Sequence, residues 1–441
     1  MASAHADDVD LEEDEGDQFI DESDVLAEVP DDGDRPMDDD DDDDGEGEDH
    51  HDAEMDADTE DTSEQAFPNH AKSVFAIAAH PTEPLAASGG EDDLGYLWDI
   101  TDGAVVARLS GHTDSVTGTA FSADGELLAT GGMDGRVRVW RRVGRADWRT
   151  WEFLTELQGP DEVMWLRWHP KGSVLLAGAN DSTVWLWQLP SGNTMQVFAG
   201  HTAPVQCGEF TPDGKRIVTA DAEGTLILWD PRAPAPLLKL TPADARFDLG
   251  GITALAVNPA SSLAVVGGAA GQLRVVSLSK GSVVGALGGH AEGDSVEAVQ
   301  FVDLAGAGGA AGVVVTGGTD GKACIWDLGT MRLRATLEHG VSAFSLSPPF
   351  SSRFRFVLGA IADLGQDAVT TLLAHPAPEG HILVSGSADA KLRTWDARTG
   401  ALLRTHSGHQ GPVLGAALGL KGDVVISAGD DGVCLVFTTL E

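Results

Sequence analysis

Histidine, a hydroxyl residue and aspartate recur together along this chain, and the same three side-chain types carry out acyl transfer in serine hydrolases. In the stretch GHTDSVTGTAFSADGELLATGGMDGRVRVW, which runs from residue 111 to 140, Thr130, Asp134 and Trp140 follow His112 by 18, 22 and 28 residues. A hydrolase needs one such set, whereas here the set is repeated. We therefore predict that these residues are structural and that the protein is not an enzyme.

The same spacing returns elsewhere in the chain. Complete or nearly complete copies are His70, Ser88, Asp92 and Trp98; His201, Thr219, Glu223 and Trp229; and His409, Ser427, Asp431 and Phe437. A fifth copy, His290, Thr316, Asp320 and Trp326, has a longer first hairpin that contains the Ala/Gly-rich residues 305–312. A sixth copy keeps Ser385, Asp389 and Trp395. The repetition predicts one structural unit built many times.

Each unit has the pattern of a small antiparallel sheet. Between residues 116 and 140, three runs of alternating polarity are separated by Asp124-Gly125 and Asp134-Gly135. Alternation broken by Asp-Gly pairs is typical of strands joined by tight turns. Two degenerate units complete a count of eight. One ends at Trp187 and has Pro160 and Ala177 in place of histidine and hydroxyl, and the other ends near Val276 with Asp248 in the histidine position.

The repeat resembles the WD-repeat family, because tryptophan is followed by aspartate at residues 98, 229, 326 and 395 and the period is about 40 to 45 residues. The resemblance implies an all-β fold: a closed β-propeller of eight four-stranded blades. It also implies that histidine, hydroxyl, aspartate and the tryptophan N–H form one hydrogen-bonded network in each blade. In the third unit, which lacks the network, we expect Trp165 to fill that space, with Trp168 also in the core.

A closed ring must join its two ends. The last unit stops four residues after Phe437, which leaves room for three strands. Residues 62–68 precede His70 where other units have their outer strand. We predict that this segment completes the last sheet and closes the ring, because an open edge strand is a liability.

The N-terminal segment has a different composition. Residues 1–66 contain 32 acidic residues and one basic residue, Arg35, whereas the other 375 residues contain 39 acidic and 27 basic ones. We predict a disordered acidic tail at 1–61 and a propeller at 62–441. Both parts are acidic, which disfavours nucleic acid and anionic membranes as partners. We expect a cytoplasmic protein, with the nucleus as an additional location, that is a monomer and binds neither cofactor nor metal.

One segment does not fit the repeat. Residues 340–365 lengthen the seventh unit, so that Trp395 follows Trp326 by 69 residues. The segment is either an insertion or a translated intron. A loop of this length is uncommon inside a compact domain.

Charge is predicted to be distributed unevenly over the two faces of the ring. The loop before each first strand and the turn between the second and third strands must share one face, because the network joins them. The acidic residues predicted on that face are Glu91, Asp93, Asp114, Asp161, Glu162, Asp221, Glu223, Asp294 and Asp430, with few bases beyond Lys72. The opposite face carries Arg141, Arg142, Arg145, Arg149, Lys171, Lys215, Arg216 and Lys280. We predict that the acidic face binds a partner.

At a finer level, the acidic leader, GGEDD (residues 89–93) and EVMWLRWHPKGSVLLAGANDSTVWLW (residues 162–187) resemble the angio-associated migratory cell protein family. Members of that family are non-enzymatic cytoplasmic proteins implicated in cell migration in animals, and a related fungal branch acts as a dedicated chaperone of a basic ribosomal protein. The resemblance implies a module that holds a Lys/Arg-rich protein. The alternative is a general scaffold in signalling or cell migration. The acidic tail either collects the same ligand or covers the basic loops at residues 141–149.

Overall fold

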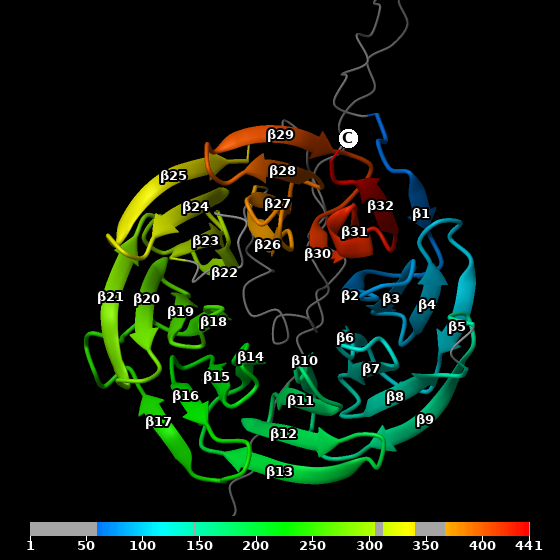
Figure 1. The fold of residues 1–441 in the computed structure, drawn as a ribbon, viewed down its shortest axis with the longest axis horizontal. Coiled ribbons are helices and arrows are strands. Elements are labelled where there is room, and N and C mark those ends of the chain that lie inside the picture. The colour runs from blue at the N-terminus through cyan, green and yellow to red at the C-terminus, as the bar shows by residue number, and fades with distance from the viewer. Residues whose placement is uncertain (1–59, 145–146, 305–311, 340–366, 441) are drawn as a thin grey trace, which may run out of the picture. The chain divides into compact units, whose positions relative to one another are not determined.

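The protein forms a ring of eight four-stranded antiparallel sheets, as predicted from the repeats. The structure is a computed structural model, and it describes residues 60–144, 147–304, 312–339 and 367–440. The first strand of each sheet lies towards the centre of the ring and the fourth lies at its rim (Figure 1). The predicted acidic tail, apart from residues 60 and 61, and the additional segment at 340–365 lie outside the described residues.

Blades are numbered here in chain order. Blade 1 contains β2 (Val74–Ala79), β3 (Leu85–Gly90), β4 (Gly95–Asp99) and β5 (Val105–Leu109); blade 2 contains β6 (Val116–Phe121), β7 (Leu127–Gly132), β8 (Val137–Arg142) and β9 (Trp151–Leu157). Blade 3 contains β10 (Val163–Trp168), β11 (Val174–Ala179), β12 (Thr183–Gln188) and β13 (Asn193–Ala199); blade 4 contains β14 (Val205–Phe210), β15 (Ile217–Asp221), β16 (Leu226–Trp229) and β17 (Pro236–Leu240).

The second half of the ring continues the pattern. Blade 5 contains β18 (Ile252–Val257), β19 (Leu263–Gly268), β20 (Gln272–Ser277) and β21 (Ser282–Gly288); blade 6 contains β22 (Val296–Val302), β23 (Val313–Gly318), β24 (Lys322–Asp327) and β25 (Arg332–Glu338). Blade 7 contains β26 (Val369–Ala374), β27 (Ile382–Ser387), β28 (Leu392–Asp396) and β29 (Ala401–His406); blade 8 contains β30 (Val413–Gly419), the 3-10 turn η3 (Leu420–Gly422), β31 (Val424–Gly429), β32 (Cys434–Thr438) and β1 (Gln65–Phe67).

The core lies between successive blades. Every residue of the second strands β3, β7, β23, β27 and β31 is buried, because a neighbouring blade covers each face of the sheet. One apolar cluster, for example, joins Leu176 and Phe198 of blade 3 to Ile217 and Trp229 of blade 4. Burial of a large apolar side chain stabilises a fold by about 1.5–3 kcal/mol. The interfaces between blades therefore hold the ring together.

Neighbouring blades also approach closely at the start of each first strand. A Cβ atom on Gly131 of β7 would lie 2.6 Å from a Val163 methyl group of the next blade, so this position requires glycine. On the same interface the Thr117 hydroxyl donates a hydrogen bond to the Val163 carbonyl. Between blades 3 and 4, the Trp165 indole N–H donates instead to the Val205 carbonyl at 2.9 Å. Trp165 is buried, as predicted, and it also links two blades.

The ring is closed by the segment that precedes blade 1. Strand β1 pairs with β32 in antiparallel register, with Ala66 opposite Leu435. Phe67 is fully buried, and its ring stacks on Trp98 of blade 1 with centroids 4.6 Å apart. The outer strand of the last blade thus comes from the start of the propeller, which confirms the prediction for residues 62–68.

Removal of residues 1–70 should lower the melting temperature sharply, because it deletes β1 and exposes both β32 and Trp98. Removal of residues 1–60 should leave one cooperative transition close to that of the full chain. Phe67→Ala should cost about 3–5 kcal/mol, as expected for truncation of a buried aromatic residue. Thermal unfolding followed by circular dichroism measures all three. Equal melting of the two truncations would show that β1 does not close the ring.

Candidate functional site

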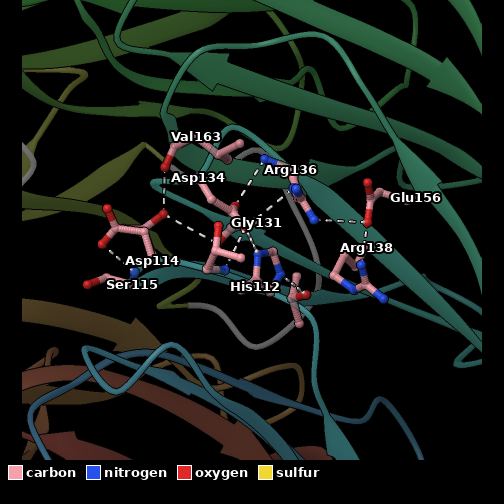
Figure 2. Close-up of polar contacts among 12 residues, drawn as sticks. His112, Asp114, Ser115, Gly131, Asp134, Arg136, Arg138, Glu156 and Val163 are labelled. Carbon is pink, nitrogen blue, oxygen red and sulfur yellow. Dashed lines mark hydrogen bonds and ion pairs between the residues drawn. The ribbon is translucent and has the colours of Figure 1, made fainter.

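In blade 2, one histidine links three separate elements of the sheet (Figure 2). His112 lies in the loop between β5 and β6, Thr130 on β7, and Asp134 in the turn between β7 and β8. The His112 Nδ1–H donates to the Asp134 carboxylate at 3.0 Å, and the Thr130 hydroxyl donates to His112 Nε2 at 2.8 Å. The Asp134 carboxylate also accepts a hydrogen bond from the Thr113 backbone N–H at 2.9 Å. A buried imidazole is therefore satisfied at both nitrogens.

The same arrangement is present in blades 1, 6 and 8. The three residues that meet are His70, Ser88 and Asp92; His290, Thr316 and Asp320; and His409, Ser427 and Asp431. Histidine-to-carboxylate distances in these sets are 3.0 Å. The spacing in the sequence thus identified the partners correctly in four blades.

Blade 4 requires a correction. The spacing placed Glu223 in the network and Asp221 on the partner-binding face, but His201 Nδ1 donates to Asp221 at 2.9 Å. Asp221 is completely buried at the end of β15, whereas Glu223 is exposed and accepts a hydrogen bond from Thr202. Asp221 occupies the position that Gly132 has in blade 2, where a Cβ atom would lie 2.7 Å from the His112 Nδ1. A side chain at this end of the strand therefore points directly at the imidazole. Asp221 is consequently unavailable to a partner.

The tryptophan joins the network in some blades and not in others. The N–H groups of Trp229, Trp326 and Trp395 donate to the hydroxyl of the same blade at 2.8 to 3.0 Å. The buried Trp98 N–H has no hydrogen-bond partner among the residues that the structure describes. Trp140 contacts the edge of Phe153, with ring centroids 5.9 Å apart. The indole is thus primarily a packing element.

Blade 7 contains a modified network that the spacing did not predict. His339 contacts Ser385 through Nε2 at 2.8 Å, and its Nδ1 accepts a hydrogen bond from Arg393 at 2.5 Å. Arg393 in turn pairs with the buried Asp389 at 2.7 Å. Burial and the Arg393 charge lower the pKa of His339 to about 3, so the ring stays neutral with its proton on Nε2. His339 precedes Ser385 by 46 residues rather than 18, and leaving out residues 340–365 still gives a separation of 20, so the repeat spacing did not identify this histidine.

The two degenerate blades fill the same space with other groups. In blade 3, the Asn180 amide donates to Glu162 at 3.0 Å, so this acidic residue joins the loop to the turn without a histidine. In blade 5, the side chains that enter the core are Phe247 and Leu249, while Asp248 between them is exposed. Asp248 therefore does not replace the histidine.

Hydrogen bonding lowers the pKa values of the network aspartates. Burial alone would raise the pKa of Asp134, but the hydrogen bonds from His112 and from the Thr113 amide hold it below its ordinary value of 3.8. The network aspartates of blades 1, 4, 6 and 8 have lowered pKa values for the same reasons. The histidines and hydroxyls themselves are enclosed between blades, where no substrate can reach them. Their arrangement supports a structural role rather than a catalytic one.

The network determines which loops share a face. We call the face that carries the loops before the first strands and the turns between second and third strands the upper face. Eight of the nine predicted acidic residues keep an exposed or half-buried side chain there: Glu91, Asp93, Asp114, Asp161, Glu162, Glu223, Asp294 and Asp430. Several have local partners. The Glu91 carboxylate lies 3.6 Å from the Lys72 ammonium group. The Asp430 carboxylate accepts a hydrogen bond from the Ser73 hydroxyl at 2.6 Å, across the seam between blades 8 and 1.

Four of these residues, Asp93, Asp114, Asp161 and Glu162, form a group across blades 1 to 3 that we call the acidic cluster. Burial and the neighbouring charge of Asp114 raise the pKa of Asp93. Burial and the charges of Asp161 and Asp114 raise the pKa of Glu162. Asp93 also has a left-handed backbone conformation, with φ of 62°. The acidic cluster thus holds mutually repelling carboxylates, and a cation bound between them would relieve that repulsion.

The opposite face does not carry a free basic patch at the arginines that were predicted there. Arg142 contacts Glu83 at 3.5 Å, and Arg149 pairs with the buried Asp99. Arg149 also covers the Trp148 ring, and the Trp151 indole donates to the Trp148 carbonyl. Arg145 lies outside the described residues. Trp148 and Trp151 pack against the apolar cluster between blades 1 and 2, and Arg142 and Arg149 are paired with acidic neighbours.

The described part of the chain contains no helix with the length and apolar character needed to cross a membrane. Nor, within the same residues, do three or more His, Cys, Asp or Glu side chains converge in a way that could hold a metal ion.

Comparison with known proteins places this geometry in context. The model of the WD domain, G-beta repeat, matches residues 61–99, 103–141, 151–188, 192–230, 361–396 and 400–438. The human angio-associated migratory cell protein is 32% identical over 391 residues, which cover 86% of this chain and 80% of that protein. An uncharacterized WD repeat-containing protein of Schizosaccharomyces pombe is 35% identical, with 97% and 98% covered.

Among solved structures, Sqt1 of Chaetomium thermophilum bound to the N-terminus of the ribosomal protein L10 superposes with a TM-score of 0.74. Its sequence is 29% identical, and the match covers 86% of this chain and all of that one.

Asp134→Ala should lower the free energy of unfolding by about 1–3 kcal/mol at neutral pH, because the buried His112 N–H loses its acceptor. The folded-state pKa of Asp134 lies below its unfolded value, so the stabilisation is present at neutral pH and is lost as the pH falls below about 4. Urea unfolding at pH 7 and pH 3 should therefore show a smaller deficit at the lower pH.

Asp181→Ala, in the corresponding turn of blade 3, serves as the control, because Asp181 is exposed and contacts no histidine. A hydrolytic activity that Asp134→Ala abolished and Asp92→Ala spared would contradict the structural interpretation of the repeated set.

Proposed function

We propose, from the premise that this chain belongs to the WD-repeat family and within it to the angio-associated migratory cell protein family, that it is a protein-binding module. Its acidic cluster on the upper face holds a Lys/Arg-rich segment of a basic protein. The most specific form of this proposal is a dedicated chaperone for a ribosomal protein during ribosome assembly.

The observation that carries the proposal is the electrostatic state of the acidic cluster. Asp114 lies close enough to Asp93 and Glu162 for its charge to raise the pKa of both. Three blades therefore direct negative charge towards one region of the upper face. A Lys or Arg side chain placed there would gain charge-assisted hydrogen bonds and remove the repulsion between the carboxylates.

The chemistry favours a basic protein over other cations and polymers. Nucleic acid would be repelled by a chain whose net charge is −43. Guanidinium groups match carboxylates in a planar, two-point geometry, and several carboxylates across neighbouring blades suit a segment that presents several basic side chains. A newly made ribosomal protein has such segments before it binds RNA, and carboxylates can occupy them reversibly.

The comparisons support the same proposal. The related Sqt1 propeller was solved with the N-terminus of ribosomal protein L10 bound. A relative from Saccharomyces cerevisiae, 30% identical over 204 residues, is named a ribosome assembly protein. We extend this partner class to the present chain because the acidic cluster supplies a site of complementary charge.

A general scaffold in signalling or cell migration is the alternative, and the name of the human relative favours it. A pull-down with the full chain at low and moderate salt distinguishes the two functions. Capture of a single basic ribosomal protein at both salt concentrations supports the chaperone, whereas a mixed set of signalling proteins supports the scaffold.

Replacing Asp114, Glu162 and Asp294 together by lysine should weaken binding of a peptide with the sequence of the L10 N-terminus by at least about tenfold at low salt. Each substitution converts attraction into repulsion at the upper face. The dependence of affinity on salt should also become flatter, because fewer ion pairs form. Fluorescence anisotropy over a salt series measures both effects.

The matched control replaces Asp102, Glu126 and Glu379 by lysine. These exposed residues lie in turns on the opposite face, and the change in net charge is the same. Binding should then decrease only slightly. If the two triple variants weakened binding equally, overall charge rather than the upper face would be responsible.

A further inference from the structure

One basic side chain lies beside the acidic cluster and is held only loosely. Lys72 belongs to the short loop between the network histidine His70 and strand β2. Its ammonium group lies 3.6 Å from Glu91, and 58% of its side chain is exposed. The Lys72 backbone carbonyl lies against Gly432 of blade 8, so the loop sits over the seam. The positive charge of Lys72 also lowers the pKa of Asp93, whereas the negative charge of Asp114 raises it.

Two other basic residues of the upper face contact acidic residues outside the acidic cluster. Arg136 lies in the turn of blade 2 and contacts Asp134 and Glu156, both at 3.9 Å (Figure 2). Arg246 is held by Asp244 in the loop before blade 5. Lys72 differs from both, because its neighbours Glu91 and Asp93 lie in the GGEDD turn that contributes Asp93 to the acidic cluster.

We propose that Lys72 is a built-in competitor ion: it partly neutralises the GGEDD turn in the free protein, and a basic ligand must displace it to reach Asp93 and Glu91. This inference rests on the proposed function. Lys72 would favour ligands that carry several positive charges over ligands that carry one. A ligand with one isolated cation gains little by replacing Lys72, whereas a segment with several cations engages the whole acidic cluster at once.

The geometry makes displacement easy. An exposed ion pair of this kind is worth little, because water screens it and both side chains lose rotamer freedom on pairing. The ammonium group of Lys72 is carried on a flexible four-carbon stem, so it can move away without a change in the backbone. Glu91, once released, adds a further carboxylate next to Asp93. Displacement of Lys72 therefore makes one more carboxylate available to the ligand.

Lys72→Gln should tighten binding of the L10 N-terminal peptide to the full chain by about two- to fivefold at low salt, the range expected for one exposed charge interaction. The gain should shrink as salt is added, because screening weakens the repulsion that the substitution removes. Lys72→Arg keeps the charge and should stay within about twofold of the wild type. Lys280→Gln makes the same charge change in an exposed turn of the opposite face and should leave the affinity unchanged.

The outcomes separate this inference from the proposed function. If the Asp114, Glu162 and Asp294 triple variant loses binding while Lys72→Gln binds no more tightly than the wild type, Lys72 is not a competitor and the proposed function stands. Equal tightening by Lys72→Arg would also overturn the inference, because the charge would not be the cause. If the wild type shows no binding that depends on salt and on the triple substitution, both the proposed function and the role of Lys72 are wrong.

Discussion

The hydrogen bond between a buried histidine and an aspartate is the interaction on which the displayed surface depends. Each imidazole lies between blades and needs a partner at both nitrogens, because an unpaired buried polar group is costly. His112 meets that need with Thr130 inside the sheet and Asp134 in a turn. These hydrogen bonds connect the loop before the first strand to the turn between the second and third strands. Side chains that flank the network are thereby held on one face.

This arrangement lets the protein maintain a repulsive surface. Apolar packing between blades and the network supply stability that does not depend on Asp93 or Asp114. The carboxylates of the acidic cluster can therefore stay close together, although their mutual repulsion and the left-handed conformation of Asp93 are unfavourable. Binding sites often retain such local cost, because the ligand relieves it. Under the proposed function, a basic side chain of the ligand would relieve the repulsion within the acidic cluster.

Variation among the blades shows what the fold requires. Blade 7 inserts Arg393 between His339 and Asp389, and blade 3 replaces the network by Trp165 and the pair formed by Asn180 and Glu162. In each case side chains fill the space, and Arg393 and the Asn180 amide nitrogen have acidic partners. Residue identity is therefore less constrained than volume and hydrogen bonding. This freedom explains why degenerate repeats still form complete blades, and why the eighth blade can take its outer strand from residues 65–67.

The sequence by itself determined the eight repeats, the closure of the ring and most of the network, because strand alternation, Asp-Gly turns and spacing are local properties of the chain. The sequence did not predict the hydrogen-bond and ion-pair partners that depend on how side chains pack in space. Only the tertiary structure showed that Asp221 rather than Glu223 meets His201, since a side chain at the end of β15 points directly at the imidazole. Likewise, the pairing of Arg149 with Asp99, and the proximity of Asp114 to Asp93 and Glu162, depend on how neighbouring blades pack. No offset along the chain encodes those distances.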